Sequence, residues 1–176
     1  MMELLAPAGN LECALAAFDA GADAVYCGLK RFNARERTEN FTFEEMSRLL
    51  AYAHKLNRHV YVTFNTLIKE DELDEAAQEL ARLEQLRPDA IIIQDLGIAR
   101  IAREYFPKLV LHGSTQMGLH NSAGLAYAGK LGLSRVILER QTTLAELEQI
   151  MRSKPPVEVE IFIHGALCCC ISGTCL

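Results

Sequence analysis

Short apolar segments and helix-like segments alternate along the whole chain, and this alternation limits the fold more than any other feature. Seven segments have the length and composition of β-strands, and they cover residues 3–6, 23–28, 59–65, 90–95, 109–115, 135–139 and 157–163. A helix-like segment follows each of the first six. Two of these helices begin with a capping box, Thr42–Glu45 and Thr143–Glu146. Strands joined by helices through short connections pair in parallel, so the sequence predicts a parallel α/β sheet.

The spacing of the strands selects among the parallel folds. It is roughly 25 residues, which suits a (β/α)8 TIM-type barrel. A complete barrel typically takes about 250 residues, whereas this chain has 176. We therefore expect residues 1–176 to form a single barrel domain with about seven strands and six helices, truncated before the eighth strand. An open Rossmann-like sheet is the alternative, and it is less favoured because no G-x-G-x-x-G motif follows the first strand.

The bulk composition is that of an ordinary soluble domain. The chain is 50% hydrophobic and 23% charged, and its formal net charge is −5. It has no apolar run long enough to cross a bilayer and no basic leader of the secretory kind, so we expect a cytoplasmic protein without membrane insertion. The mild negative charge does not favour a general nucleic-acid surface, although a local basic patch is compatible with it.

Alternate residues of a barrel strand face the lumen, and here the inward set is polar towards the strand ends. The expected inward-facing residues are Tyr61, Thr63 and Asn65; His112, Ser114 and Gln116; and Glu158, Glu160, Phe162 and His164. The apolar residues between them, Ile161 and Ile163 included, should pack against helices. Barrel enzymes place their active sites at the C-terminal ends of the strands, so the polar set predicts a pocket there.

Strand-end position alone gives five candidate residues for this pocket, and Glu160, which lies deeper, is added as a structural or orienting carboxylate. We expect His112 and His164 to be catalytic, with His164 at the mouth as a proton carrier or a ligand-binding residue. The residues that we expect to bind or orient the substrate are Asn65, Arg35, Gln116 and Glu160. Glu160 and His164 would lie about 13 Å apart along a strand, too far for a direct acid–base pair. The alternative is that these polar groups satisfy one another inside a hydrated core.

Four of the six cysteines lie near the end of the chain, directly after the last predicted strand. They are Cys168, Cys169, Cys170 and Cys175. In a reducing compartment such a cluster favours a metal site or catalysis over disulfides. Consecutive side chains diverge, so two ligands here plus others further along is the easier arrangement, and both zinc and an iron–sulfur cluster accept thiolates. Buried structural thiols, or a nucleophilic cysteine activated by His164, are the alternatives.

At this level of detail the sequence resembles a known family. The signature is Glu160-x-Phe162-x-x-Gly165-Ala166-Leu167-Cys168-x4-Gly173-x-Cys175, and it is similar to that of the U32 peptidases, also called collagenase-like proteases. The other matching segments are Leu5–Asn10, Gly21–Tyr26, Phe32–Arg35, Asn40–Thr42, Ser114–Gln116 and Arg135–Leu138. The resemblance covers essentially the whole chain, and it implies an N-terminal barrel, in agreement with the strand count.

The resemblance also implies chemistry. The family name implies proteolysis, but several members take part in oxygen-independent hydroxylation of a tRNA uridine, an rRNA cytidine or a ubiquinone precursor. The RNA-modifying members use prephenate as the oxygen source and hold a [4Fe-4S] cluster with four cysteines. The first two of these match Cys168 and Cys175, and the other two would lie beyond residue 176. Cys169 and Cys170 stand where the family often lacks cysteine.

The leading hypothesis is therefore the N-terminal barrel of an iron–sulfur enzyme that hydroxylates an RNA base or a related aromatic substrate. A Cys-dependent or metal-dependent peptidase is the first alternative, although the sequence has neither H-E-x-x-H nor G-x-S-x-G. A ubiquinone-precursor hydroxylation factor and a non-catalytic scaffold are the others. A barrel without its eighth strand has open edges, which predicts pairing into a homodimer.

Overall fold

The computed structural model describes residues 2–35, 39–165, 168 and 170–173. Seven strands form one parallel sheet, and each strand pairs with the next one along the chain. The strands are β1 (Leu5–Pro7), β2 (Ala24–Gly28), β3 (His59–Phe64), β4 (Ala90–Ile93), β5 (Leu111–Gly113), β6 (Arg135–Ile137) and β7 (Glu158–Glu160).

Six α-helices connect the strands, and most begin with a side chain that caps the first turn. The helices are α1 (Leu11–Asp19), α2 (Phe43–Lys55), α3 (Leu73–Leu86), α4 (Leu96–Tyr105), α5 (Ser122–Lys130) and α6 (Leu144–Arg152). Both predicted capping boxes are present, because Thr42 and Glu45 exchange hydrogen bonds at the start of α2, and Thr143 and Glu146 do so at α6. Such reciprocal caps satisfy backbone N–H groups that the first turn leaves unpaired.

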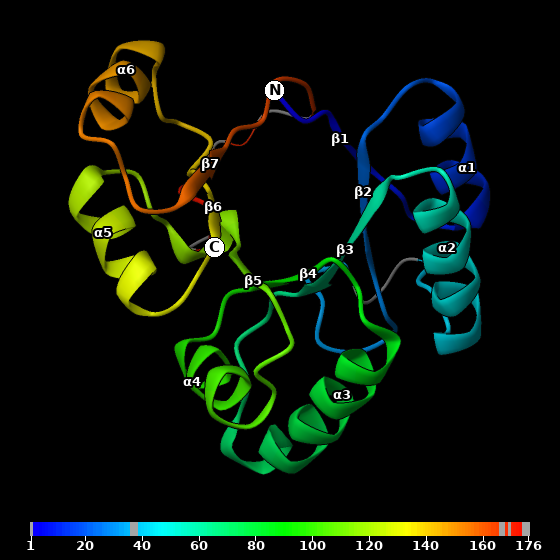
Figure 1. Cartoon of the computed structure of the whole chain (residues 1–176). Coiled ribbons are helices and arrows are strands. Elements are labelled where there is room, and N and C mark those ends of the chain that lie inside the picture. Colours follow the sequence, from blue (N-terminus) through cyan, green and yellow to red (C-terminus); the bar gives the residue numbers. More distant parts are fainter. Residues whose placement is uncertain (1, 36–38, 166–167, 169, 174–176) are drawn as a thin grey trace.

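The sheet curls into an arc, with the helices on its outer side (Figure 1). Its strand order is β1-β2-β3-β4-β5-β6-β7, so β1 and β7 are its two edges. This sequential order confirms the predicted TIM-like architecture with seven strands and six helices. It differs from the Rossmann alternative, in which the strand order reverses part-way across the sheet. Within the described residues, no helix is both long enough and apolar enough to span a bilayer.

The two faces of the strands carry different cores. The outer faces, with Val60, Val62 and Phe64 of β3 among them, pack against the helices in one large apolar cluster. The inner faces form a second, smaller cluster, and it consists of Ala24, Tyr61, Ala90, Ile92 and Ile137, with Leu5 and Tyr26 packed beside it. The predicted inward and outward sets are confirmed for β3, since side chains alternate between the faces of a strand.

Several strands end earlier than the sequence predicts. β5 stops at Gly113, because the Ser114 hydroxyl accepts a hydrogen bond from the Gln116 amide and starts a 3-10 turn over Thr115–Met117. β7 stops at Glu160, so Ile161 and Ile163 are 41% and 77% exposed and do not pack on helices as expected. One helix also begins later than predicted, because residues Glu70–Glu72 form a 3-10 turn and α3 starts only at Leu73. The early ends of the strands leave polar loops around the C-terminal mouth of the sheet.

Candidate functional site

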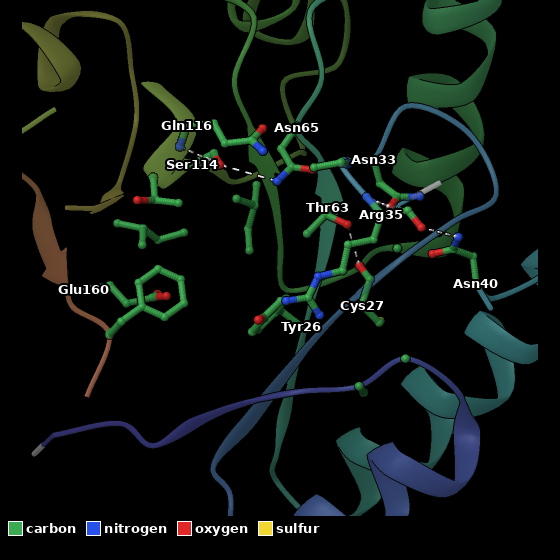
Figure 2. Close-up of a pocket in the computed structure, with 18 of the residues that line it drawn as sticks. Tyr26, Cys27, Asn33, Arg35, Asn40, Thr63, Asn65, Ser114, Gln116 and Glu160 are labelled. Atoms are coloured by element: carbon green, nitrogen blue, oxygen red, sulfur yellow. Dashed lines mark hydrogen bonds between the residues drawn. The ribbon is translucent and has the colours of Figure 1, made fainter. Parts of the chain in front are cut away.

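A cavity of about 490 Å³ lies at the C-terminal ends of the strands, inside the arc of the sheet. All four predicted substrate-binding residues line it, and they are Arg35, Asn65, Gln116 and Glu160. In Figure 2, Asn33, Arg35, Tyr26 and Thr63 lie on one side of the cavity and Glu160 lies on the other, with Ser114 and Gln116 between. This volume is in the range of small-molecule sites, which are usually about 300–1,000 Å³.

The loop after β2 brings Arg35 to the cavity. Asn33 is buried, and its side-chain oxygen accepts a hydrogen bond of 2.8 Å from the Arg35 amide. The Asn65 side-chain oxygen accepts one of 3.0 Å from the Ala34 amide, so the end of β3 holds the same loop. The guanidinium carbon of Arg35 then lies 6.0 Å from the ring centroid of Tyr26, within cation–π range.

The turn after β5 forms the next part of the wall. The Asn65 amide group lies 3.4 Å from the Ser114 hydroxyl, which links the ends of β3 and β5 (Figure 2). The Thr115 hydroxyl donates to the Leu138 carbonyl at 3.0 Å and so links β5 to β6. The Gln116 amide also donates to the Ser114 hydroxyl, so hydrogen bonds of Ser114 and Thr115 fix the backbone at this point. Gln116 itself lines the cavity. Donors and acceptors held on strand ends in this way can orient a polar ligand.

Two further residues line the wall opposite Arg35. The guanidinium carbon of Arg140, which follows β6, lies 4.2 Å from the ring centroid of Phe162. Both residues line the cavity. The site therefore carries a guanidinium on two sides, Arg35 and Arg140, each close to an aromatic ring. Guanidinium groups bind carboxylates and phosphates through paired hydrogen bonds, so this lining suits an anionic ligand with a ring or another planar group.

Beneath the cavity, one guanidinium faces three carboxylates. Arg135 Nη1 donates to Glu3 at 2.6 Å and lies 3.5 Å from Glu160, while Arg135 Nη2 donates to Glu158 at 2.7 Å. The Tyr61 hydroxyl also donates to Glu3, at 2.8 Å. Burial alone would raise the pKa of Glu3, but the hydrogen bonds from Arg135 and Tyr61 outweigh it and lower that pKa. Glu160 has only the longest of the three contacts with the guanidinium.

Glu160 consequently differs from the other two carboxylates. Burial raises the pKa of Glu160 to about 7, and the attraction of Arg135 only partly opposes this effect. Its Oε2 atom is buried and has no hydrogen-bond partner among the described residues. Near neutral pH the carboxyl of Glu160 is therefore divided between its two protonation states, at the base of the cavity. A carboxyl in that condition can both donate and accept a proton.

The two predicted catalytic histidines do not line the cavity. His112 faces inward as expected, but it is buried with its ring centroid 4.8 Å from that of Tyr61. Burial, aided by the charge of Arg135, lowers the pKa of His112 to about 4. His164 lies beyond the end of β7 and is exposed, because the strand stops four residues earlier. His112 thus has the predicted inward direction, but neither histidine is among the residues that line the cavity.

The described part of the cysteine segment places thiols near this end of the sheet. Cys168 and Cys170 are both half-buried, and the Cys168 thiol donates to the Cys170 carbonyl at 3.1 Å. The other predicted ligand, Cys175, lies outside the described residues, as does Cys169. No group of three metal-ligating side chains occurs among the described residues. Cys168 could therefore bind a metal ion or cluster through its thiolate only if residues outside the described part of the chain supply the other ligands.

Comparison with known proteins defines the family. A family model described as Peptidase family U32 matches residues 9–176. The chain belongs to the peptidase U32 family. A solved structure of a U32 peptidase shares its fold, with a TM-score of 0.72 at 12% sequence identity, covering 92% of this chain and 68% of that one.

Curated U32 relatives match almost all of this chain. The "tRNA hydroxylation protein P" of Escherichia coli (strain K12) is 40% identical over 174 residues, covering 99% of this chain and 38% of that protein. An uncharacterized protease of Methanocaldococcus jannaschii is 41% identical over 179 residues, covering 99% of this chain and 43% of that protein. The chain thus spans less than half the length of these relatives.

Strand-end reasoning missed several residues of this U32 site. Arg140 follows β6 without a pattern that marks it, and only the fold shows that it lies beside Phe162. Tyr26 and Asn33 fall in segments that carry the family resemblance, and the inward parity of β2 could have identified Tyr26. Such residues can be identified only when the register between neighbouring strands is known, because the sequence of one strand does not show which residues of other strands lie opposite it.

Gly28 provides a direct test of the cavity wall. A Cβ atom at this position would lie 2.8 Å from both the Asn33 side chain and the Thr63 hydroxyl. We expect Gly28→Ala to lower the free energy of unfolding by about 1–3 kcal/mol, the usual cost of overpacking, as measured by urea unfolding. Gly9→Ala is the matched control, since Gly9 also lines the cavity but has open space around it. Equal stability of both variants would contradict this packing.

Proposed function

We propose that this chain is the N-terminal barrel of an iron–sulfur-dependent enzyme that hydroxylates a base of tRNA or rRNA without molecular oxygen. The observation that carries the proposal is the cavity with a guanidinium on two sides at the C-terminal mouth of the sheet, next to the cysteine segment. A relative with 40% identity is named a tRNA hydroxylation protein, which supports an RNA substrate.

In the proposed reaction, prephenate binds in the cavity and supplies the oxygen atom. Prephenate has two carboxylates and a ring, so Arg35 and Arg140 would hold the carboxylates while Tyr26 and Phe162 contact the ring. Asn65 and Gln116 would orient its polar groups. Glu160 would hold or release a proton at the base of the cavity, where its pKa of about 7 permits either.

The proposed cofactor is a [4Fe-4S] cluster held by Cys168, Cys175 and further ligands beyond residue 176. Thiolates are the usual ligands of such clusters, and when bound the cluster supplies redox or Lewis-acid chemistry. The role of this chain would then be to supply two of the thiolates and to exclude water from the ligand in the cavity. The RNA base would reach the cavity from the open, C-terminal side of the sheet.

Proteolysis is the second candidate, and it rests on the family name and on the relative described as an uncharacterized protease. A cysteine protease needs a base within hydrogen-bond reach of the nucleophile. Among the described residues, the Cys168 thiol donates to a backbone carbonyl and no hydrogen bond joins it to His164. The described geometry therefore does not support a Cys168–His164 protease.

Iron and acid-labile sulfide should be measured first, on the full-length protein purified without oxygen. We expect about four of each per chain, and Cys168→Ala and Cys175→Ala should each lose most of both. Cys13→Ala is the matched control, because Cys13 is an exposed cysteine of α1. Nucleoside mass spectrometry should then show prephenate-dependent RNA hydroxylation. Absence of iron and sulfide after reconstitution, with Cys-dependent cleavage of peptides, would refute the proposal in favour of a peptidase.

A further inference from the structure

Glu139, two residues beyond β6, is a buried carboxylate without a cation. It is 5% exposed, and no ion pair involves it among the described residues. Its Oε2 atom accepts a hydrogen bond of 2.6 Å from the Gln141 amide. A buried carboxylate is costly unless several donors satisfy it, so the remaining donors to Glu139 decide what it does.

One remaining donor is the Arg140 backbone amide, and the others come from the cysteine segment. Glu139 Oε1 accepts from the backbone amide of Ser172 at 3.2 Å and from its hydroxyl at 3.4 Å. Ser172 is itself 6% exposed, although the residues on either side of it are exposed. It stands in the chain between Cys170 and Cys175. Both of these hydrogen bonds join the segment to the body of the barrel, and both end on the Glu139 carboxylate.

The next residue of the segment packs against the wall of the cavity. Gly173 has φ +86°, and a Cβ atom there would lie 2.0 Å from the Gln116 carbonyl oxygen. Only glycine allows so close an approach with that backbone conformation. Because Gln116 lines the cavity, the segment is held from two sides, by Glu139 at the end of β6 and by the turn that follows β5.

We propose that Glu139 is a positioning residue, which fixes Ser172 and thereby sets where the neighbouring thiols lie at the mouth of the cavity. Glu139 acts through the two hydrogen bonds to Ser172, and loss of these bonds frees the segment from β6. The consequence for cofactor loading rests on the proposed function, whereas the position of the thiols does not.

The test measures thiol reactivity in the full-length protein, reduced and stripped of metal. N-ethylmaleimide modification is followed at each cysteine by peptide mass spectrometry. We expect Glu139→Gln to label Cys168 and Cys170 about tenfold faster, because the amide loses the charge and has one acceptor oxygen for donors that the carboxylate binds with two. Cys13, which is exposed, and Cys27, which is buried, serve as internal references and should keep their rates.

Glu146→Gln is the matched control variant. Glu146 also accepts backbone and hydroxyl hydrogen bonds, from Thr143, but it does so at the start of α6 and away from the cysteine segment. It should leave the rates at Cys168 and Cys170 unchanged. Unchanged rates in Glu139→Gln as well would overturn the inference.

A second variant covers the case in which Glu139→Gln opens the whole fold and Cys27 also becomes reactive. Ser172→Ala removes only the hydroxyl donor and should accelerate Cys168 and Cys170 alone, by a smaller factor. If Ser172→Ala changes neither rate, the inference fails. In iron-loaded protein, Glu139→Gln should also release iron faster to a chelator. A protein that binds no iron would refute the proposed function but leave the thiol result standing.

Discussion

Replacing Arg135 by methionine should lower the free energy of unfolding by about 3–5 kcal/mol near pH 8, the usual effect of removing one partner from a buried ion pair. The side chain of Arg135 is 13% exposed, and those of Glu3 and Glu160 are 23% and 18% exposed. Without the guanidinium, these two carboxylates face each other in a space that excludes most water. Urea unfolding of the full-length protein, monitored by a probe within this barrel, gives the measurement.

Two controls separate this network from ordinary surface charge. Arg152→Met removes a guanidinium from an exposed pair with Glu148 on α6, and it should change the stability by less than about 1 kcal/mol. The double variant Arg135→Met with Glu160→Gln should recover part of the lost stability, because it removes one of the two carboxylates that Arg135→Met leaves unpaired. Equal effects of Arg135→Met and Arg152→Met would show that the inner network does not contribute to stability.

This network also shows where prediction from the sequence ends. The inward direction of Tyr61, Glu158 and Glu160 follows from the two-residue period of a strand, and the polarity of the inner face could be predicted. The pairing of Arg135 with Glu3 could not, since 132 residues separate them and no local pattern specifies which inward charges meet. Only the register of seven strands brings them together.

The candidate site was predictable to a similar extent. Asn65, Gln116, Arg35 and Glu160 could be chosen because polar residues at strand ends converge at one edge of a parallel sheet. His164 does not line the cavity because β7 ends before it, and the position of a strand end depends on hydrogen bonds that are not local. β7 stops at Glu160, and the Glu160 carbonyl accepts from the Leu138 amide. The Ser172–Glu139 contact spans 33 residues and leaves no periodic signal in the sequence.

Replacing Glu160 by glutamine should make stability less dependent on pH. The pKa of Glu160 is about 7 in the folded protein, above its ordinary value of 4.5. A carboxyl whose pKa is raised by folding contributes stability that is complete below about pH 4.5 and is lost as the pH rises through about 7. Between pH 5 and pH 8.5 the wild-type protein should therefore lose about 2–3 kcal/mol from this group, and the variant should not.

The difference in free energy of unfolding between Glu160→Gln and wild type, measured over this pH range, isolates the effect because other titrating groups cancel. Relative to wild type, the variant should become more stable as the pH rises. Glu158→Gln is the control, since that carboxylate contacts the same guanidinium but is 68% exposed, so solvent screens its charge. A flat difference curve for Glu160→Gln would mean that Arg135 keeps Glu160 ionised throughout. Glu160 would then orient a ligand in the cavity without exchanging a proton with it.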